Sequence, residues 1–241
     1  MIPETFRRLS VEKYLILFLV ILGIEGLLKN SFALAQLVLS PLVAAVSDFV
    51  ANYFRYKRKE FPEHGLITGL IIALVLSPVS LFASVIIPVI AIALKHVIRY
   101  KGRNIFNPAA LGMFVSAAAL GVQAAWWSVG YLAIPFGFIV AYKIRRLYNP
   151  LSFIAGSSAI SAAYAYINSG KWLLPINASM FFFAFVMLLE PVTSPHTKKG
   201  QVIFGVSAAV ISFFLGFTAA DIFLASLLAM NLFTPWLNKV K

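Results

Sequence analysis

A polar stretch between two apolar segments reads Gly102-Arg103-Asn104-Ile105-Phe106-Asn107-Pro108-Ala109-Ala110-Leu111-Gly112. Asparagine accepts hydrogen bonds from the first free N–H groups of a helix, and proline is favoured at the first helical position. The pair Asn107-Pro108 therefore predicts a helix that begins at Pro108. The free N–H groups and the positive dipole end of this helix would face an anion or an electron-rich ring.

The apolar segments beside this stretch are part of a longer series. Of the 241 residues, 61% are hydrophobic and only 12% are charged, against about 25% charged in soluble domains. This composition excludes a soluble globular fold and predicts an all-α integral membrane protein, with about ten transmembrane helices in a single membrane domain, residues 1–241. The predicted segments are Tyr14–Leu28, Phe32–Ala51, Gly65–Ser77, Leu81–Leu94, Ile105–Leu120, Val129–Tyr142, Leu151–Ile167, Trp172–Leu189, Val202–Phe217 and Ile222–Leu237.

Some of these segments are too short to cross a membrane alone. Gly65–Ser77 has 13 residues, which as a helix cover about 20 Å of a hydrocarbon core of about 30 Å. Such a segment is a short or broken helix whose ends are covered by other parts of the protein.

The segments also recur along the chain. Corresponding features lie 113 to 118 residues apart: Tyr14 and Tyr131, Phe32 and Pro150, Ile105 and Asp221, and Leu76-Ser77-Pro78 and Leu189-Glu190-Pro191. Because five is an odd number, a second set of five helices must enter the membrane upside down. We therefore predict two inverted five-helix repeats, residues 1–121 and 122–241.

The formal charge of +12 indicates the orientation of the chain. If all ten segments cross, 18 of the 20 Lys and Arg residues fall on the side of the N-terminus, and only Lys29 and Lys171 on the other. Cytoplasmic loops carry such an excess, which predicts a plasma-membrane protein with both termini in the cytoplasm. The cations then face anionic lipid, and a nucleic-acid surface is excluded.

Familiar hydrolytic and metal-binding patterns are absent from the sequence. It contains no cysteine, no Gly-x-Ser-x-Gly, no Walker loop and no His-rich run, so we predict no metal site and no catalytic residue. The acidic residues Glu25, Asp48 and Asp221 lie near the ends of apolar segments. This position favours exposure at the membrane interface over a role in an ion path.

Two further polar stretches complete a set of three. Glu63-His64-Gly65-Leu66-Ile67-Thr68-Gly69-Leu70 precedes the first stretch, and Glu190-Pro191-Val192-Thr193-Ser194-Pro195-His196-Thr197-Lys198-Lys199-Gly200-Gln201 follows it. In this order, over about 145 residues, the three resemble the membrane subunits NqrB and RnfD of the sodium-translocating NADH:quinone oxidoreductase and the Rnf complex. The resemblance implies a ten-helix subunit of an ion-translocating oxidoreductase, which carries flavin and works with redox partner subunits.

This sequence departs from the family pattern in two places. Family members bind FMN covalently through a threonine after the fifth span, but Gly121–Ser128 contains no threonine and Gly216-Phe217-Thr218-Ala219 does not match the segment. Glu190 also stands where an aspartate is usual. The resemblance then implies a noncovalent flavin, FMN or riboflavin. The residues expected to bind it are Thr68, Arg103, Asn104, Asn107, Pro108, Glu190, Thr193, Ser194 and Lys199.

Two other functions are compatible with the same sequence. Folds with five-plus-five inverted repeats also form central pathways, so the chain could be a channel or transporter for a small solute, including a flavin. It could also be a membrane scaffold that only docks partners.

Overall fold

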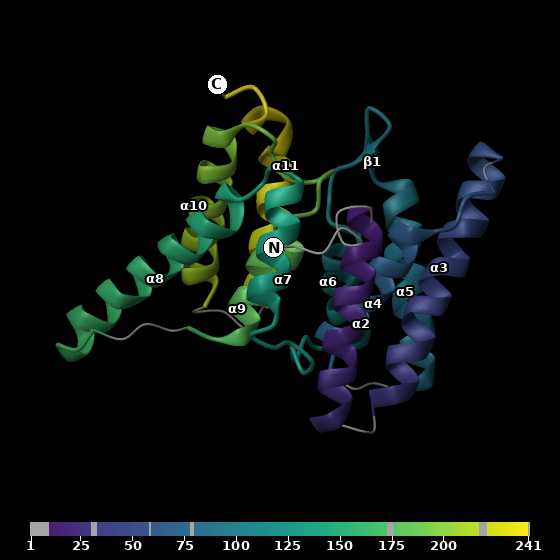
Figure 1. Ribbon diagram of the computed structural model, residues 1–241, viewed down its shortest axis with the longest axis horizontal. Coiled ribbons are helices and arrows are strands. Elements are labelled where there is room, and N and C mark those ends of the chain that lie inside the picture. Colours follow the sequence, from purple (N-terminus) through teal and green to yellow (C-terminus); the bar gives the residue numbers. More distant parts are fainter. Residues whose placement is uncertain are drawn as a thin grey trace, which may run out of the picture. The chain divides into compact units, whose positions relative to one another are not determined.

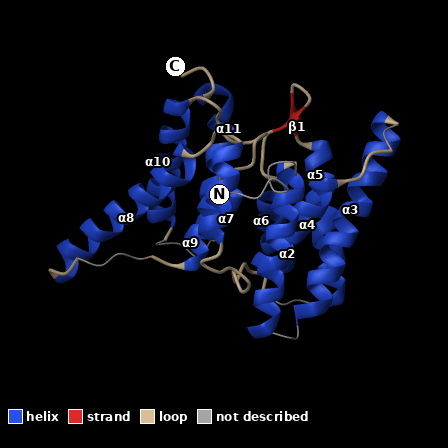
Figure 2. Cartoon of the chain, in the orientation of Figure 1, coloured by secondary structure: helices blue, strands red, loops and turns tan. Residues whose placement is uncertain are grey.

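The computed structural model describes residues 10–29, 33–57, 59–77, 80–172, 176–216 and 221–240. Within these residues the regular structure is helical apart from one hairpin and an isolated bridge (Figures 1 and 2). The first elements are α2 (Val11–Lys29), α3 (Leu34–Tyr56), α4 (Glu63–Val75), α5 (Leu81–Val97), β1 (Arg99–Tyr100), β2 (Arg103–Asn104) and α6 (Pro108–Leu120). The others are α7 (Ala133–Lys143), α8 (Tyr148–Ser169), α9 (Ala178–Phe182), the π-helix η2 (Phe183–Met187), α10 (Lys198–Leu215) and α11 (Ile222–Leu237).

The predicted all-α fold is confirmed. Helix α6 begins at Pro108, as the Asn107-Pro108 pair predicts, and α11 has the predicted bounds. Several residues used in the sequence predictions lie outside the described part of the chain: Arg7, Arg8, Phe32, Arg58, Pro78, Phe217, Thr218, Ala219 and Lys241.

The eighth apolar segment begins later than the sequence predicts. The sequence predicts a helix from Trp172, whereas α9 begins at Ala178. Asn177 accepts a hydrogen bond from the backbone N–H of Met180 at 2.8 Å, which fixes the start of the helix directly after it. From Phe183 to Met187 the hydrogen-bond pattern widens to that of a π-helix. Residues 173–175 lie outside the described part of the chain.

The chain forms two compact units that do not follow chain order. Unit 1 consists of Met1–Lys101 and Leu111–Val129, and unit 2 consists of Gly102–Ala110 and Gly130–Lys241. The segment Gly102–Ala110 therefore packs with the second half of the chain, and α6 begins in unit 2 and continues in unit 1.

In unit 1, α4 is the central helix. It packs against α2, α3 and α5, and its residues from Thr68 to Val75 are all buried. A Cβ atom at Gly69 would lie 2.4 Å from the Cα of Pro41, so the backbones of α4 and α3 touch at this point. The side-chain amide of Gln36 on α3 donates to the carbonyls of Ala73 and Leu76 at 2.9 and 3.2 Å. These bonds satisfy carbonyls at the end of a short helix.

In unit 2, α10 packs against both α8 and α11, and the segment Phe182–Leu189 is buried. The side-chain amide of Asn149 on α8 donates to the carbonyl of Leu188 at 3.2 Å, at the end of η2. Gln36 and Asn149 are 113 residues apart, which is the offset between Leu76 and Leu189 in the sequence. In each unit, an amide near the start of the second helix thus binds carbonyls at the end of the third.

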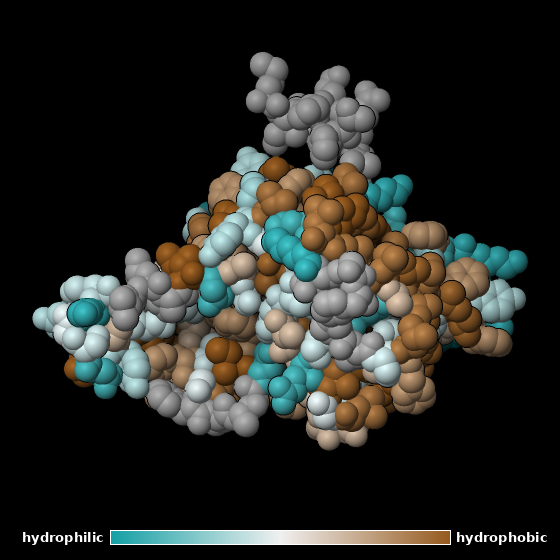
Figure 3. Space-filling model, turned by 90° about the horizontal axis from the view of Figure 1, so that it is seen from below, coloured by the Kyte–Doolittle hydropathy of each residue, from teal (hydrophilic) through white to brown (hydrophobic). Residues whose placement is uncertain are grey.

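Large apolar side chains are also exposed on the surface. Phe54, Phe82 and Phe214 are each at least 66% exposed, and hydrophobic residues cover much of the face seen in Figure 3. Among the helices in the described part of the chain, α3 and α10 can cross a membrane by length and composition, and six apolar helices are shorter. Within unit 1, α4 has 13 residues, or about 20 Å, in agreement with a short helix.

Candidate functional site

Two of the three polar stretches meet in unit 2, in a group of polar side chains of which four are buried and two, Arg146 and Glu190, are half-buried. We refer to this group as the motif cluster. Its members are Asn107, Arg146, Glu190, Thr193, Ser194 and Asn231.

Asn107 performs the capping role predicted from the sequence. Its side-chain Oδ1 accepts a hydrogen bond from the backbone N–H of Ala110 at 3.0 Å. Its Nδ2 donates to the carbonyl of Met187 at 3.5 Å, and its backbone N–H donates to Oδ1 of Asn231 at 2.9 Å. The residue is 2% exposed. The side chain of Asn107 thus already uses one of its two N–H groups and one of the two lone pairs of its oxygen for bonds within the protein.

Asn231 links two distant stretches and was missed by the sequence reasoning. Besides accepting from Asn107, it donates from Nδ2 to the carbonyl of Thr193 at 3.0 Å, and the hydroxyl of Thr234 donates to the same carbonyl at 2.7 Å. Asn231 is fully buried. An asparagine within the apolar segment Ile222–Leu237 was the available signal, because polar side chains in such helices hydrogen-bond to neighbouring elements.

Glu190 organises the turn that follows η2. The hydroxyl of Thr193 donates to Oε2 of Glu190 at 2.8 Å, and the hydroxyl of Ser194 donates to the Glu190 carbonyl at 2.8 Å. The backbone N–H groups of Thr193 and Ser194 also donate to that carbonyl, at 3.3 and 3.1 Å. Thr193 and Ser194 are buried, whereas Pro191 and Val192 are exposed, so this turn is packed on the side of its hydroxyl groups.

Arg146 holds the other side of this turn. Its Nη1 donates to the carbonyl and hydroxyl of Ser194 and to the carbonyl of Pro195, and its Nη2 donates to the carbonyl of Pro191 at 3.0 Å. Burial lowers the pKa of Arg146 from its usual value, but a guanidinium stays protonated in proteins. The sequence predicted for Arg146 only a place among the cations on the cytoplasmic side, and not a role in holding this turn.

The remaining predicted site residues lie in several places. Pro108 is the buried first residue of α6, and Arg103 and Asn104 form β2, with Arg103 exposed and Asn104 half-buried. Lys199 is exposed in the first turn of α10. Thr68 belongs to unit 1, where its hydroxyl donates to the carbonyl of His64 at 2.9 Å. The motif cluster therefore contains four of the nine predicted residues: Asn107, Glu190, Thr193 and Ser194.

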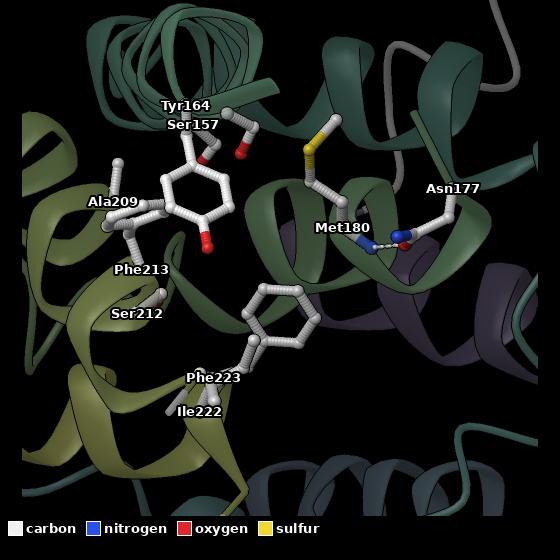
Figure 4. A pocket seen from close by; sticks show the side chains of 11 residues that line it. Ser157, Tyr164, Asn177, Met180, Ala209, Ser212, Phe213, Ile222 and Phe223 are labelled. Atoms are coloured by element: carbon white, nitrogen blue, oxygen red, sulfur yellow. Dashed lines mark hydrogen bonds between the residues drawn. The ribbon is translucent and has the colours of Figure 1, made fainter. Parts of the chain in front are cut away.

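A cavity of about 310 Å³ lies toward the other end of the unit 2 helices (Figure 4). Helix α10 runs from Lys198, near the motif cluster, to Leu215, beside the cavity, a length of about 27 Å. The lining residues come from α8 to α11 and the residues beside them: Ser157, Ser161, Tyr164, Asn177, Met180, Ala209, Ser212, Phe213, Gly216, Ile222 and Phe223.

The cavity combines aromatic surfaces with hydroxyl groups. The hydroxyl of Tyr164 points into the open space (Figure 4), and its ring contacts the edge of Phe213 at 5.3 Å between centroids. Phe223 stacks on the buried Phe183 of η2, with centroids 4.9 Å apart and planes at 20°. Such a lining suits a flat ring system with polar edges. Sequence reasoning missed it, because the lining residues come from separate helices and form no motif.

The expected exposure of Asp48 is wrong. Asp48 is 2% exposed, and its Oδ1 accepts from Nζ of Lys95 at 2.8 Å and pairs with Nε2 of His96 at 2.9 Å. Helix α3 continues to Tyr56, so Asp48 lies about two turns inside it. Its partners are 47 and 48 residues further along the chain.

The other two acidic residues lie at helix ends. Glu25 is half-buried and pairs with Lys29 at 2.9 Å within the last turns of α2. Asp221 accepts from the backbone N–H of Leu224 at 2.8 Å and caps the start of α11.

The model of the NQR2, RnfD, RnfE family matches the chain twice, over residues 5–131 and 117–241. The chain therefore belongs to the NQR2, RnfD, RnfE family. It is an all-α membrane protein built from two copies of the family's repeat, and a membrane subunit of the Nqr and Rnf type of electron-transport complex. The comparison with curated proteins gives no match.

Proposed function

We propose that this chain takes part in flavin-dependent electron transport, as the membrane subunit of a complex with redox partner subunits, and that this transport is coupled to ion movement. The observation that carries the proposal is the double family match, which covers both halves of the chain. The two amide contacts at equivalent positions, from Gln36 and Asn149, support the same repeated architecture.

A noncovalent flavin fits the residues of unit 2. Ligand pockets usually measure about 300–1,000 Å³, so a cavity of about 310 Å³ takes a tricyclic ring and not a whole dinucleotide. Tyr164, Phe213 and Phe223 offer apolar surfaces, while Ser157 and Ser161 lie on the α8 side. A bound flavin supplies one- and two-electron redox chemistry, and the protein positions it and adjusts its surroundings.

We place the ring in the cavity because most polar atoms of the motif cluster already form hydrogen bonds within the protein. The Asn107 side chain is bonded at both ends, and the hydroxyls of Thr193 and Ser194 both donate to Glu190. In this proposal the motif cluster fixes the ends of α6, η2 and α11. Direct binding of a ligand by Asn107 or Thr193 is the competing prediction.

The orientation of the chain is part of the proposal. The exposed cations near the motif cluster, Arg145, Lys199 and Lys239, lie at the same ends of the unit 2 helices. Excess positive charge faces the cytoplasm in membrane proteins. The motif cluster then lies on the cytoplasmic side, where soluble redox partners can approach, and the cavity lies toward the opposite side.

A visible absorption spectrum of the purified protein in detergent tests the proposal. We expect the absorption bands of flavin, and denaturation should release the flavin because it is bound noncovalently. If the purified protein is colourless, we expect it to bind added riboflavin or FMN. A protein that carries no flavin and binds neither compound would contradict the proposed function.

A pair of variants on one helix tests the position of the ring. Ser157→Phe places a ring in the cavity and should weaken flavin binding at least tenfold, while Ala159→Phe on the exposed face of α8 should not. If Asn107→Ala and Thr193→Ala weaken binding and Ser157→Phe does not, the ring binds at the motif cluster and not in the cavity.

Transport of a small solute, such as a flavin, is the second candidate function. It is favoured by the short helices, since α4 has 13 residues and α7 has 11, and broken or short helices often surround a solute site in transporters. Solute flux into proteoliposomes without an electron donor would support transport. Flavin-dependent electron transfer without such flux would favour the first proposal.

A further inference from the structure

The last turn of α3, in unit 1, carries cations that lie on aromatic rings. The guanidinium groups of Arg55 and Arg99 lie 5.6 and 5.8 Å from the centroid of the Tyr56 ring, and Arg99 also donates to the Tyr56 hydroxyl. Arg99 belongs to β1, so this ring joins the end of α3 to the hairpin at the same end of unit 1 (Figure 1). Contacts of this kind hold a cation in place without removing its charge.

Two lysines extend this group of cations. Nζ of Lys57 lies 5.5 Å from the ring centroid of Tyr53, and Nζ of Lys101 lies 5.5 Å from that of Tyr100. Both lysines are exposed. We refer to the four cations as the cationic cluster: Arg55, Lys57, Arg99 and Lys101.

Carboxylates do not balance the charge of the cationic cluster. Within the part of the chain that the structure describes, no salt bridge involves Arg55, Lys57 or Lys101. The acidic residues that follow α3 closely in the chain are Glu60 and Glu63, which are two charges against four. This end of unit 1 therefore keeps an excess of positive charge, which attracts an anion.

The two lysines also occupy backbone positions that favour glycine. The angle φ is 56° at Lys57, which caps the end of α3, and 49° at Lys101. Residues other than glycine and asparagine are uncommon in this left-handed conformation, which costs backbone energy. Backbone stability therefore does not explain lysine at these positions, and the side-chain charge is what lysine adds there.

An apolar stripe runs along α3 to the cationic cluster. Its members are Val38, Leu42, Val46, Phe49 and Tyr53, each at least 36% exposed. Spacings of three and four residues place them on one face of the helix, and the next step of four reaches the cap residue of α3. The stripe is about 22 Å long, against a hydrocarbon core of about 30 Å.

A phospholipid matches the cluster and the stripe together. Its phosphate is an anion of the kind that Arg and Lys bind, and its acyl chains cover apolar helix faces. Tyrosine rings such as Tyr53 and Tyr56 are typical of the level where headgroups begin. A soluble acidic protein would leave the stripe uncovered. A second copy of the chain on the stripe would bring its own cations towards the cluster.

We propose that the cationic cluster and the apolar stripe bind an anionic phospholipid, with the headgroup phosphate at the cluster and an acyl chain along the stripe. Arg55 and Arg99 offer forked donors to the phosphate oxygens, and Lys57 and Lys101 add charge beside them. The site lies in unit 1 and uses no residue of the cavity or the motif cluster. It can therefore be present even if the proposed function is wrong.

Native mass spectrometry of the delipidated protein tests the proposal. It counts the lipids bound to each protein during titration with phosphatidylglycerol, and with phosphatidylcholine of the same acyl chains. We expect phosphatidylglycerol to bind at least about fivefold more tightly, because phosphatidylcholine has no net charge. Inorganic phosphate at millimolar concentration should not displace the lipid, since it lacks an acyl chain.

A double variant separates loss of charge from loss of folding. Lys57→Gly with Lys101→Asn removes two charges and inserts residues that suit the left-handed backbone. Without lipid its melting temperature should equal or exceed that of the original protein, while its affinity for phosphatidylglycerol should fall about tenfold or more. Lys171→Gln with Lys239→Gln removes two exposed lysines of unit 2 and should leave this affinity unchanged.

Four results would overturn the proposal. Equal affinity for the two lipids would show that charge is not recognised, and unchanged binding in the Lys57→Gly, Lys101→Asn variant would remove the cluster from the site. Displacement of the lipid by inorganic phosphate would leave a site for free anions only. A lipid-free dimer in the mass spectrum would assign the stripe to a second copy of the chain.

Discussion

The backbone N–H of Asn107 donates to Oδ1 of Asn231 at 2.9 Å, although 124 residues separate them in the chain. Asn231 uses its Nδ2 to bind the carbonyl of Thr193. One buried side chain thus joins the start of α6 to the turn after η2, and both of these stretches are recognisable in the sequence. The motifs are close in space because a third residue, which belongs to neither, bonds to both.

Asn231→Ala should therefore destabilise the protein. It leaves a buried N–H and weakens the bonding of a buried carbonyl, which should cost about 2 to 4 kcal/mol of the free energy of unfolding. Thermal unfolding in detergent measures the loss. Asn168→Ala is the control, because Asn168 is exposed and bonds only one turn back on its own helix. Equal stability of the two variants would contradict the joining role of Asn231.

Arg146→Lys should loosen the turn from Glu190 to Pro195. Lysine keeps the charge but lacks the forked donors that reach Pro191 and Ser194 at once. We expect a loss of about 1 to 3 kcal/mol and faster trypsin cleavage at Lys198 and Lys199. Arg145→Lys, at the exposed neighbouring position, should change neither. Unchanged cleavage in Arg146→Lys would show that other contacts hold the turn.

Gly69→Ala should separate two helices of unit 1. The new Cβ atom would lie 2.4 Å from Cα of Pro41 and 2.5 Å from the carbonyl oxygen of Ser40. Because these are backbone atoms, α4 must move away from α3, at a cost of about 1 to 3 kcal/mol. Gly156→Ala in α8 meets its nearest atom, Cβ of Ala209, at 3.2 Å, and should change stability by less than about 1 kcal/mol. The melting temperatures of the two variants are compared in the same detergent. If Gly69→Ala lowers the melting temperature less than Gly156→Ala does, the close contact between α4 and α3 is refuted.

Gln36→Leu should destabilise the end of α4. The variant keeps the volume but removes the donor that serves the carbonyls of Ala73 and Leu76, and both bonds are buried. We expect a loss of about 1 to 3 kcal/mol in unfolding experiments. Gln123→Leu, the same change at an exposed loop position, should have little effect. A similar result for both variants would mean that water or lipid replaces the amide.

Local signals in the sequence predict the helices well. Asn107-Pro108 marks a helix start by capping, and capping depends only on residues within one turn. The same reasoning placed the eighth segment too early, because the cap at Asn177 was not recognised within the apolar run. Apolar composition shows that a segment is buried or in lipid, but it does not show where the helix begins.

Partners far apart in the chain explain the other errors. The position of Asp48 near a segment end favoured exposure, but burial depended on Lys95 and His96, which no spacing rule connects to it. In the same way, the cavity in unit 2 is lined from separate helices, so Tyr164 and Phe223 carry no signal of their own in the sequence. The sequence motifs predicted four members of the motif cluster, because motifs are local. They did not predict Arg146 and Asn231, whose hydrogen bonds reach residues far away in the chain.

The segment Gly102–Ala110 belongs to unit 2, although the residues on both sides of it in the chain belong to unit 1, and this has a consequence for biosynthesis. The ribosome makes Asn107 long before Asn231, and at about 5–20 residues per second the 124 residues between them take about 6 to 25 seconds. During that time the start of α6 lacks its final partners, even if unit 1 has entered the membrane. Synthesis of α11 therefore closes this part of the structure, and a nascent chain that stops before α11 exposes unsatisfied polar groups that quality-control proteases can recognise.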